Sequence, residues 1–133
     1  MKNKKNYLKK HENCSGKIGV VGFCFGGWIS NAMAVRVSEL LAAVPFYGGQ
    51  PHESEVSQIN ASLLLHYAGL DQRVNAGWPA YEKALLENKK TFEAHFYSDV
   101  NHGFHNNTTP RYDEKAATLA WERTLTFFKE KLS

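Results

Sequence analysis

The sequence has 133 residues, 43% of them hydrophobic and 22% charged, which is typical of one compact globular domain. No stretch reaches the roughly 18 consecutive apolar residues of a membrane span, and the basic start lacks the apolar run of a secretory signal. We therefore expect a cytoplasmic protein without a membrane partner.

The formal net charge of +3 comes from the beginning of the chain. Residues 1–17 carry six lysines and one acidic residue, Glu12, so the rest of the chain is weakly acidic. We expect residues 1–16 to form a basic helix or tail. A nucleic-acid partner is not indicated, because it would need a basic face on the folded body. Two cysteines are too few for a disulfide scaffold, and Cys14 lies in a polar stretch typical of a loop.

Apolar runs and helical patterns alternate along the chain. Residues 17–23 are mostly apolar and bounded by glycines, as in a strand covered on both faces. A helix is expected over residues 25–38, with a core-facing apolar stripe of Trp28, Ile29, Ala32, Met33 and Val37. Further strands are predicted at residues 41–47, 62–66 and 91–97, further helices at 78–88 and 113–131, and polar loops at 69–75 and 98–110.

The alternation of strands and helices indicates βαβ units in a single domain over residues 1–133. The predicted fold class is therefore α/β, with a mostly parallel sheet flanked by helices. In such sheets, functional side chains gather in the loops beyond the carboxyl ends of the strands. The two predicted polar loops both follow a strand, so we looked there for chemistry.

Residues 22–26 read G-F-C-F-G, a pattern in which Cys24 stands at the tip of a sharp turn from strand to helix. Such a turn presents a nucleophile, and the residues two before and two after it are expected to be small. The amide of Phe25 would then lie at a helix N-terminus, where it can stabilise an oxyanion and favour a thiolate. A buried cysteine without a chemical role fits the same five residues.

Two polar residues follow later strands in the order that an elbow-type hydrolase requires. Asp71 follows the strand at 62–66, and His102 follows the strand at 91–97. His102 would take the thiol proton and Asp71 would orient its ring. Asp71 could instead cap a helix, His102 could be a loop residue without a role, and Asp99 is a rival acid.

The other histidines give weaker signals. His105 forms H-x-x-H with His102, but no further ligand pattern supports a metal, so we expect neither a metal nor a cofactor. His66 either lines the site or is a core residue. His11, His52 and His95 have the surroundings of surface residues.

Four segments carry a family resemblance: G-K-I-G-V-V-G-F-C-F-G-G, V-P-F-Y-G, L-L-L-H-Y-A-G-L-D-Q-R-V-N-A-G-W-P-A-Y-E and N-H-G-F-H-N-N-T-T-P-R-Y-D. They are similar to segments of dienelactone hydrolases, also called carboxymethylenebutenolidases. The resemblance implies an α/β-hydrolase fold and hydrolysis of an enol-lactone or related ester through an acyl-cysteine. It assigns Cys24, Asp71 and His102 as catalytic residues and Phe25 as an oxyanion donor, with pocket residues Tyr47, Trp78 and Phe104. A core role fits Trp78 equally well.

The resemblance covers only the C-terminal half of the family's domain. The other half would supply the first strands of the sheet and a second oxyanion amide. A family arginine that holds a substrate carboxylate is replaced here by Asn106. The strand at 17–23 becomes an open edge, so we expect self-association there or pairing with an N-terminal half on a separate chain. A non-catalytic remnant or association module is the alternative function.

Overall fold

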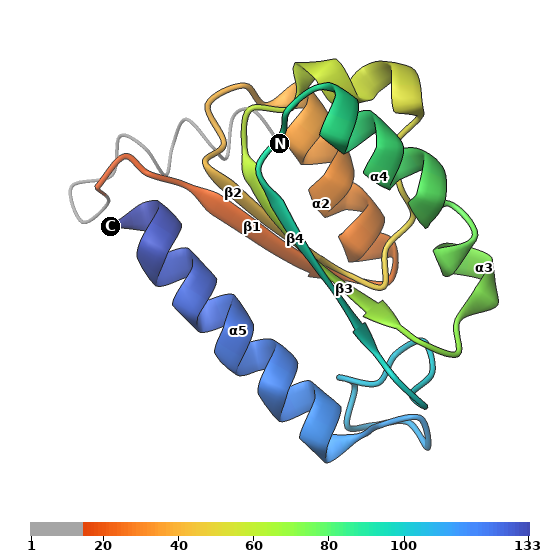
Figure 1. Cartoon of the computed structure of the whole chain (residues 1–133). Helices are drawn as coiled ribbons and strands as arrows, with labels where there is room; N and C mark the ends of the chain where they lie inside the picture. Colours follow the sequence, from red (N-terminus) through yellow and green to blue (C-terminus); the bar gives the residue numbers. More distant parts are fainter. Residues whose placement is uncertain (1–14) are drawn as a thin grey trace.

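The structure is a computed structural model that describes residues 15–133. The expectations for residues 1–14, including most of the basic tail and Cys14, lie outside the described residues. Four parallel strands form one sheet in the order β1-β2-β3-β4, with helices on both faces (Figure 1). The elements are β1 Gly19–Phe23, α2 Phe25–Arg36, β2 Ala42–Phe46, η1 Glu53–Gln58, β3 Ser62–Ala68, α3 Gln72–Asn75, α4 Trp78–Glu87, β4 Phe92–Tyr97 and α5 Glu114–Leu132.

All four predicted strands and the three longer helices are present, which confirms the α/β class. Two short helical segments, η1 and α3, were not anticipated. The one-turn helix α3 falls inside the predicted polar loop at 69–75, where hydrophobic periodicity gives no signal over so few residues. None of the helices in residues 15–133 has the length and apolarity needed to cross a bilayer.

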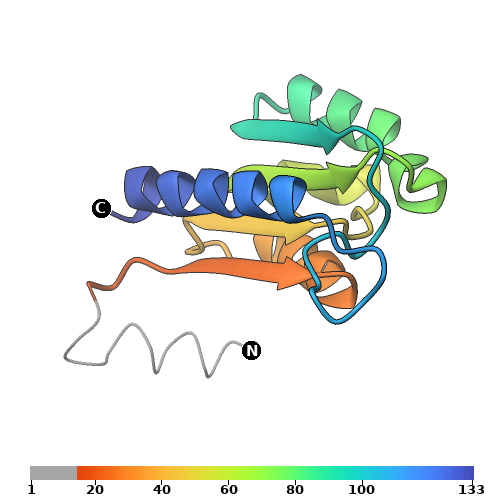
Figure 2. The same ribbon diagram turned by 90° about the horizontal axis from the view of Figure 1, so that it is seen from below.

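The register of the sheet aligns the carboxyl ends of its strands. Phe23 pairs with Phe46, Phe46 with His66, and His66 with His95. The residues that follow these strand ends therefore leave the sheet at one edge. Figure 2 shows the loop between β4 and α5 crossing this edge toward β1.

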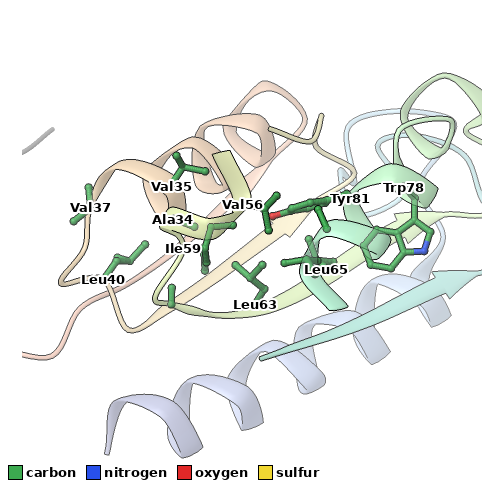
Figure 3. Packing of buried hydrophobic residues seen from close by; sticks show 14 of the residues in the cluster. Ala34, Val35, Val37, Leu40, Val56, Ile59, Leu63, Leu65, Trp78 and Tyr81 are labelled. Atoms are coloured by element: carbon green, nitrogen blue, oxygen red, sulfur yellow. The ribbon is translucent and has the colours of Figure 1, made fainter. Parts of the chain in front are cut away.

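Two apolar layers enclose the sheet. Helix α5 covers one face, and α2 and α4 cover the other (Figures 1 and 2). Figure 3 shows the cluster beneath α2 and α4, in which Leu63 and Leu65 of β3 pack with Tyr81 and Trp78 of α4. Strands β2 and β3 are almost entirely buried, whereas β1 is only half-buried along its length.

The apolar stripe predicted for this helix is only partly right, because Val37 is buried and Met33 packs against the core but Trp28 does not face inward. Apart from Val35, the buried residues of this helix are small or polar: Gly27, Ser30, Asn31 and Ala34. Trp28 is 44% exposed and stacks on the exposed ring of Phe25, with ring centroids 5.4 Å apart. The reason is the close approach of α2 to the sheet. A Cβ on Gly27 would lie 2.6 Å from the Phe46 carbonyl oxygen, so a bulky stripe could not face inward here.

Candidate active site

Cys24 stands alone between the last residue of β1 and the first residue of α2. Its backbone has φ 58° and ψ −118°, a left-handed φ that L-residues rarely adopt. The Cys24 amide donates to the Phe46 carbonyl at 3.1 Å, and the Cys24 carbonyl accepts from the Gly27 and Trp28 amides. The side chain is exposed. The strained turn therefore projects the thiol beyond the carboxyl edge of the sheet, as the pattern predicts.

The glycines around the turn have different roles. A Cβ on Gly22 would collide with the carbonyl of Gly26 and lie 2.7 Å from the Ser30 hydroxyl oxygen, so this position requires glycine. A Cβ on Gly26 would meet nothing within 4 Å. The expectation that the residue two after the cysteine must be small is therefore not met at Gly26. The tight position on the helix side is Gly27.

Asp71 and His102 lie in direct contact at this edge. Nδ1 of His102 is 2.7 Å from Oδ2 of Asp71, and the Asp71 side chain is only 7% exposed. Oδ1 of Asp71 accepts from the Val74 amide at 3.2 Å and caps α3. One oxygen of Asp71 thus caps a helix, and the other contacts the histidine. Asp99, the rival acid, is exposed.

Tyr47 packs beside His102, with ring centroids 4.8 Å apart. It follows β2 directly, has a left-handed φ of 38° and is buried. Burial raises the pKa of the Tyr47 phenol, the nearby Cys24 raises it further, and the backbone of His105 opposes the shift by a hydrogen bond. A neutral phenol thus lies next to the imidazole and close to the thiol.

Phe104 and Trp78 are both buried, one in each apolar layer of the fold. Phe104 is fully buried beneath Tyr47, where it belongs to the apolar layer under α5. Trp78 lies on the opposite face of the sheet in the cluster of Figure 3, and its ring contacts Tyr67 and Tyr81. Both side chains therefore have the surroundings of core residues, and the contacts of neither include Cys24 or His102.

The surroundings of Cys24 favour the neutral thiol over the thiolate, because its pKa is raised. The neighbouring atoms desolvate the thiol in part and so raise its pKa. The charge of Arg111 lowers this pKa, and the charge of Asp71 raises it. The expectation of a thiolate favoured by the helix N-terminus is thus not met. Within residues 15–133 the thiol makes no hydrogen bond to His102. A nucleophilic role for Cys24 would therefore require a base at the moment of reaction.

Arg111 was missed by the sequence reasoning. Its Nη1 atom donates to the His102 carbonyl at 3.4 Å, and its charge reaches the Cys24 thiol. It lies in the loop between β4 and α5, where no spacing rule distinguishes it from other surface arginines. Its proximity depends on how this loop folds back over the strand ends.

The remaining histidines have separate surroundings. His66 is fully buried and contacts the Tyr97 hydroxyl through Nδ1 at 2.9 Å and Thr124 Oγ1 through Nε2 at 3.0 Å. This identifies His66 as a core residue. The His105 ring stacks on Phe23, with ring centroids 5.0 Å apart. No three His, Cys, Asp or Glu side chains of the described chain gather as a metal site would require.

Comparisons with known proteins bear on the whole chain. A profile of the Dienelactone hydrolase family matches residues 1–132. Protein usf of Aquifex pyrophilus is 35% identical over 121 residues, which are 88% of this chain and 52% of the relative. The carboxymethylenebutenolidase of Pseudomonas putida is 28% identical over 127 residues, which are 91% of this chain and 52% of that protein.

Among solved structures, a dienelactone hydrolase-like promiscuous phosphotriesterase from metagenomic libraries superposes with a TM-score of 0.86. The identity is 23%, and the match covers 97% of this chain and 59% of the other, so this likeness shows the fold. The chain spans about half the length of the curated relatives that it matches.

Proposed function

Because the chain belongs to the dienelactone hydrolase family and has part of the α/β-hydrolase fold, we propose that it carries the catalytic residues of an ester or lactone hydrolase. Cys24 is the nucleophile, His102 the base and Asp71 the residue that orients the base. The substrate class is an enol-lactone or small ester. The observation that carries the proposal is the 2.7 Å contact between Asp71 Oδ2 and His102 Nδ1 at the edge where Cys24 projects.

Each step follows from the chemistry of these groups. Nε2 of His102 takes the proton of the Cys24 thiol as sulfur attacks the carbonyl carbon, and Asp71 stabilises the imidazolium. The oxyanion forms against the Phe25 amide, which lies in the first turn of α2 where backbone N–H groups lack intrahelical partners. The C–O bond then breaks, and the leaving oxygen takes the proton from His102. Water, deprotonated by His102, hydrolyses the thioester and restores the thiol.

A chromogenic ester tests this proposal. Purified chain should hydrolyse p-nitrophenyl acetate, and Cys24→Ala and His102→Ala should each reduce kcat by about 10³-fold or more. Asp99→Asn is the matched control, because Asp99 lies in the same loop as His102 but is exposed. A burst of p-nitrophenol equal to the enzyme concentration would report the acyl-cysteine. Equal rates for wild type and Cys24→Ala would contradict a nucleophilic cysteine.

A non-catalytic association module is the second candidate function. The observation that favours it is the exposure of the turn itself, since the Phe25 side chain is 70% exposed and a Cβ on Gly26 would enter open space. Background hydrolysis by all variants, together with a folded chain by circular dichroism, would support this candidate over the hydrolase.

We also propose that a second copy of this chain pairs along β1. Within the described sheet β1 pairs with β2 alone, so its other side presents free backbone N–H and C=O groups, which readily pair with another strand. Beside it, α5 leaves Leu125 half-exposed next to Phe128 and Leu132, lining a groove of about 520 Å³. Apolar surface of this kind is typical of protein contacts.

Light scattering after size-exclusion chromatography tests the pairing. Wild-type chain should elute as a dimer, and Leu125→Glu should shift it to a monomer. Leu86→Glu is the control, because Leu86 is 62% exposed on α4, which lies on the opposite face of the sheet. A wild-type monomer at micromolar concentration would contradict the proposal.

A further inference from the structure

Gln50 lies in the loop after β2, outside the groups that the proposed reaction uses. Its Nε2 atom donates to the Val74 carbonyl at 2.9 Å and to the Tyr67 hydroxyl at 3.3 Å. Val74 is the third residue of α3, the single turn that Asp71 caps. A side chain from one strand-end loop thus holds the short helix that belongs to another.

The contacts continue from α3 to the histidine. The carbonyl of Val74 accepts from Gln50, and the amide of Val74 donates to Oδ1 of Asp71 at 3.2 Å. This amide occupies one carboxylate oxygen, so the other, Oδ2, faces Nδ1 of His102 at 2.7 Å. A helix of four residues has little stability of its own, because forming the first turn of a helix is costly. External support for α3 is therefore needed to fix the carboxylate.

The loop that carries Gln50 is itself rigidly placed. Asn31 of α2 donates to the Gly49 carbonyl at 2.9 Å, and the Tyr81 hydroxyl donates to Asn31 Oδ1 at 2.9 Å. A Cβ on Gly48 would collide with the backbone of Gly27, so this loop lies directly against the first turn of α2. The same loop therefore contacts the helix that follows Cys24 and, through Gln50, the helix that Asp71 caps.

Gly77 provides the space for the Gln50 amide. A Cβ on Gly77 would collide with Oε1 of Gln50 and lie 2.9 Å from its Cδ. Gly77 has an ordinary φ of −83°, so backbone conformation does not require glycine there. Position 77 has no side chain because the Gln50 amide occupies the space that a Cβ there would fill.

We propose that Gln50 is a positioning residue that holds α3 so that Asp71 presents Oδ2 to His102. The expected effect on kcat rests on the proposed function. The placement of Asp71 against His102 does not depend on it. Gln50 touches none of the groups assigned to bond-making. Through Val74 it links the loop after β2 to the position of the Asp71 carboxylate.

The test uses four variants of the whole chain: Gln50→Ala, Gly77→Ala, the double variant, and Gln72→Ala as control. Gln72 is an exposed glutamine on α3 itself, so this control makes the same change of side chain without removing the Val74 contact. Far-UV circular dichroism and urea unfolding establish that each variant is folded. Gly77→Ala should displace the Gln50 amide by steric contact, which tests the same link even if Gln50→Ala folds poorly.

The first readout is independent of catalysis. The proton on Nδ1 of His102, shared with Asp71, gives a downfield proton resonance by nuclear magnetic resonance, assigned by its absence in His102→Ala. This resonance should weaken or move upfield in Gln50→Ala and Gly77→Ala and stay unchanged in Gln72→Ala. The second readout is ester hydrolysis, in which kcat should fall roughly tenfold with KM nearly constant, because misplaced catalytic groups slow the chemical step.

The double variant sharpens the result. Once Gln50 is alanine, a Cβ at position 77 no longer meets the amide. The double variant should therefore show no larger change in kcat or in the His102 resonance than Gln50→Ala alone. An unchanged His102 resonance in folded Gln50→Ala would overturn the inference. So would a fall in kcat of the double variant equal to the product of the two single falls. An inactive wild type with the resonance changes intact would instead count against the proposed hydrolase and leave the positioning role supported.

Discussion

Asp71 divides its carboxylate between two elements, because Oδ1 caps α3 while Oδ2 lies 2.7 Å from Nδ1 of His102. The acid is therefore part of the local fold as well as of the candidate site. Substitutions that remove one of these roles and keep the other can separate them.

Asp71→Asn should keep the cap and lose the charge. Asparagine caps helices nearly as well as aspartate, so the free energy of unfolding should change by less than about 0.5 kcal/mol. The neutral amide cannot stabilise the imidazolium, so kcat for ester hydrolysis should fall by about 10²–10⁴-fold. In Asp71→Ala the free energy of unfolding should fall by about 1 kcal/mol more, because the helix cap is missing. Urea unfolding with parallel kinetics measures both effects, and wild-type kcat in Asp71→Asn would show that the charge has no catalytic role.

Gly22→Ala and Gly26→Ala should have opposite effects on stability. The new methyl at position 22 collides with the Gly26 carbonyl, so we expect a loss of about 3 kcal/mol or an unfolded chain. The methyl at position 26 enters open space in the first turn of α2, where alanine is the better helix former, so stability should rise by up to about 1 kcal/mol. Urea unfolding of the two variants checks this, and similar losses in both would contradict the packing described around the turn.

The buried His66 should make the fold sensitive to acid. Burial, followed by the charges of His95, Arg123 and His105, lowers the pKa of His66 to about 3. An unfolded histidine has a pKa near 6.5, so below that pH the unfolded state binds a proton that the folded state does not. Stability should therefore be fully present above about pH 6.5 and fall by about 1.4 kcal/mol per pH unit between roughly pH 6 and pH 4.

The matched variant for this effect is His66→Gln, since an amide can donate to Thr124 and accept from Tyr97. Its unfolding free energy should decline less steeply over the same pH range, whatever its level at pH 7. Equal slopes in wild type and variant would mean that other groups set the acid sensitivity.

Arg111→Gln should make the Cys24 thiol less reactive. The charge of Arg111 lowers the pKa of Cys24, so its removal raises that pKa further and decreases the thiolate fraction at a fixed pH. Iodoacetamide alkylation at pH 8 should slow by roughly twofold or more, and Arg111→Lys should retain most of the wild-type rate. Arg73→Gln, on the exposed side of α3, is the control, and an alkylation rate unaffected by loss of Arg111 would show that its charge does not reach the thiol.

The parts of the structure that sequence could predict are those set by repeating patterns. Four apolar runs separated by helices predict a parallel sheet, and a parallel sheet brings its carboxyl-end loops together. This is why Asp71 and His102 could be paired although 31 residues separate them. The strained turn at Cys24 was likewise predictable, because a glycine on its strand side signals a close approach of backbone.

The parts that sequence could not predict depend on contacts between elements. Part of the stripe of α2 was misplaced because helical periodicity cannot show that backbone from the loop after β2 lies against Gly27. The sequence left Trp78 open between a pocket and a core role, because an aromatic residue after the acid loop fits either face of the sheet. The raised pKa of Cys24 results from partial desolvation and from Asp71, whereas the helix N-terminus suggested the opposite direction.

The open side of β1 has a geometric consequence if two copies meet there. A twofold axis between identical strands makes them run in opposite directions, so the joined sheet would be parallel within each copy and antiparallel at its centre. Each Cys24 follows the carboxyl end of its own β1, so two strands of five residues that pair along their whole length would place the thiols at opposite ends, about 17 Å apart. Two such sites would open on opposite rims of one continuous sheet and could act independently of each other.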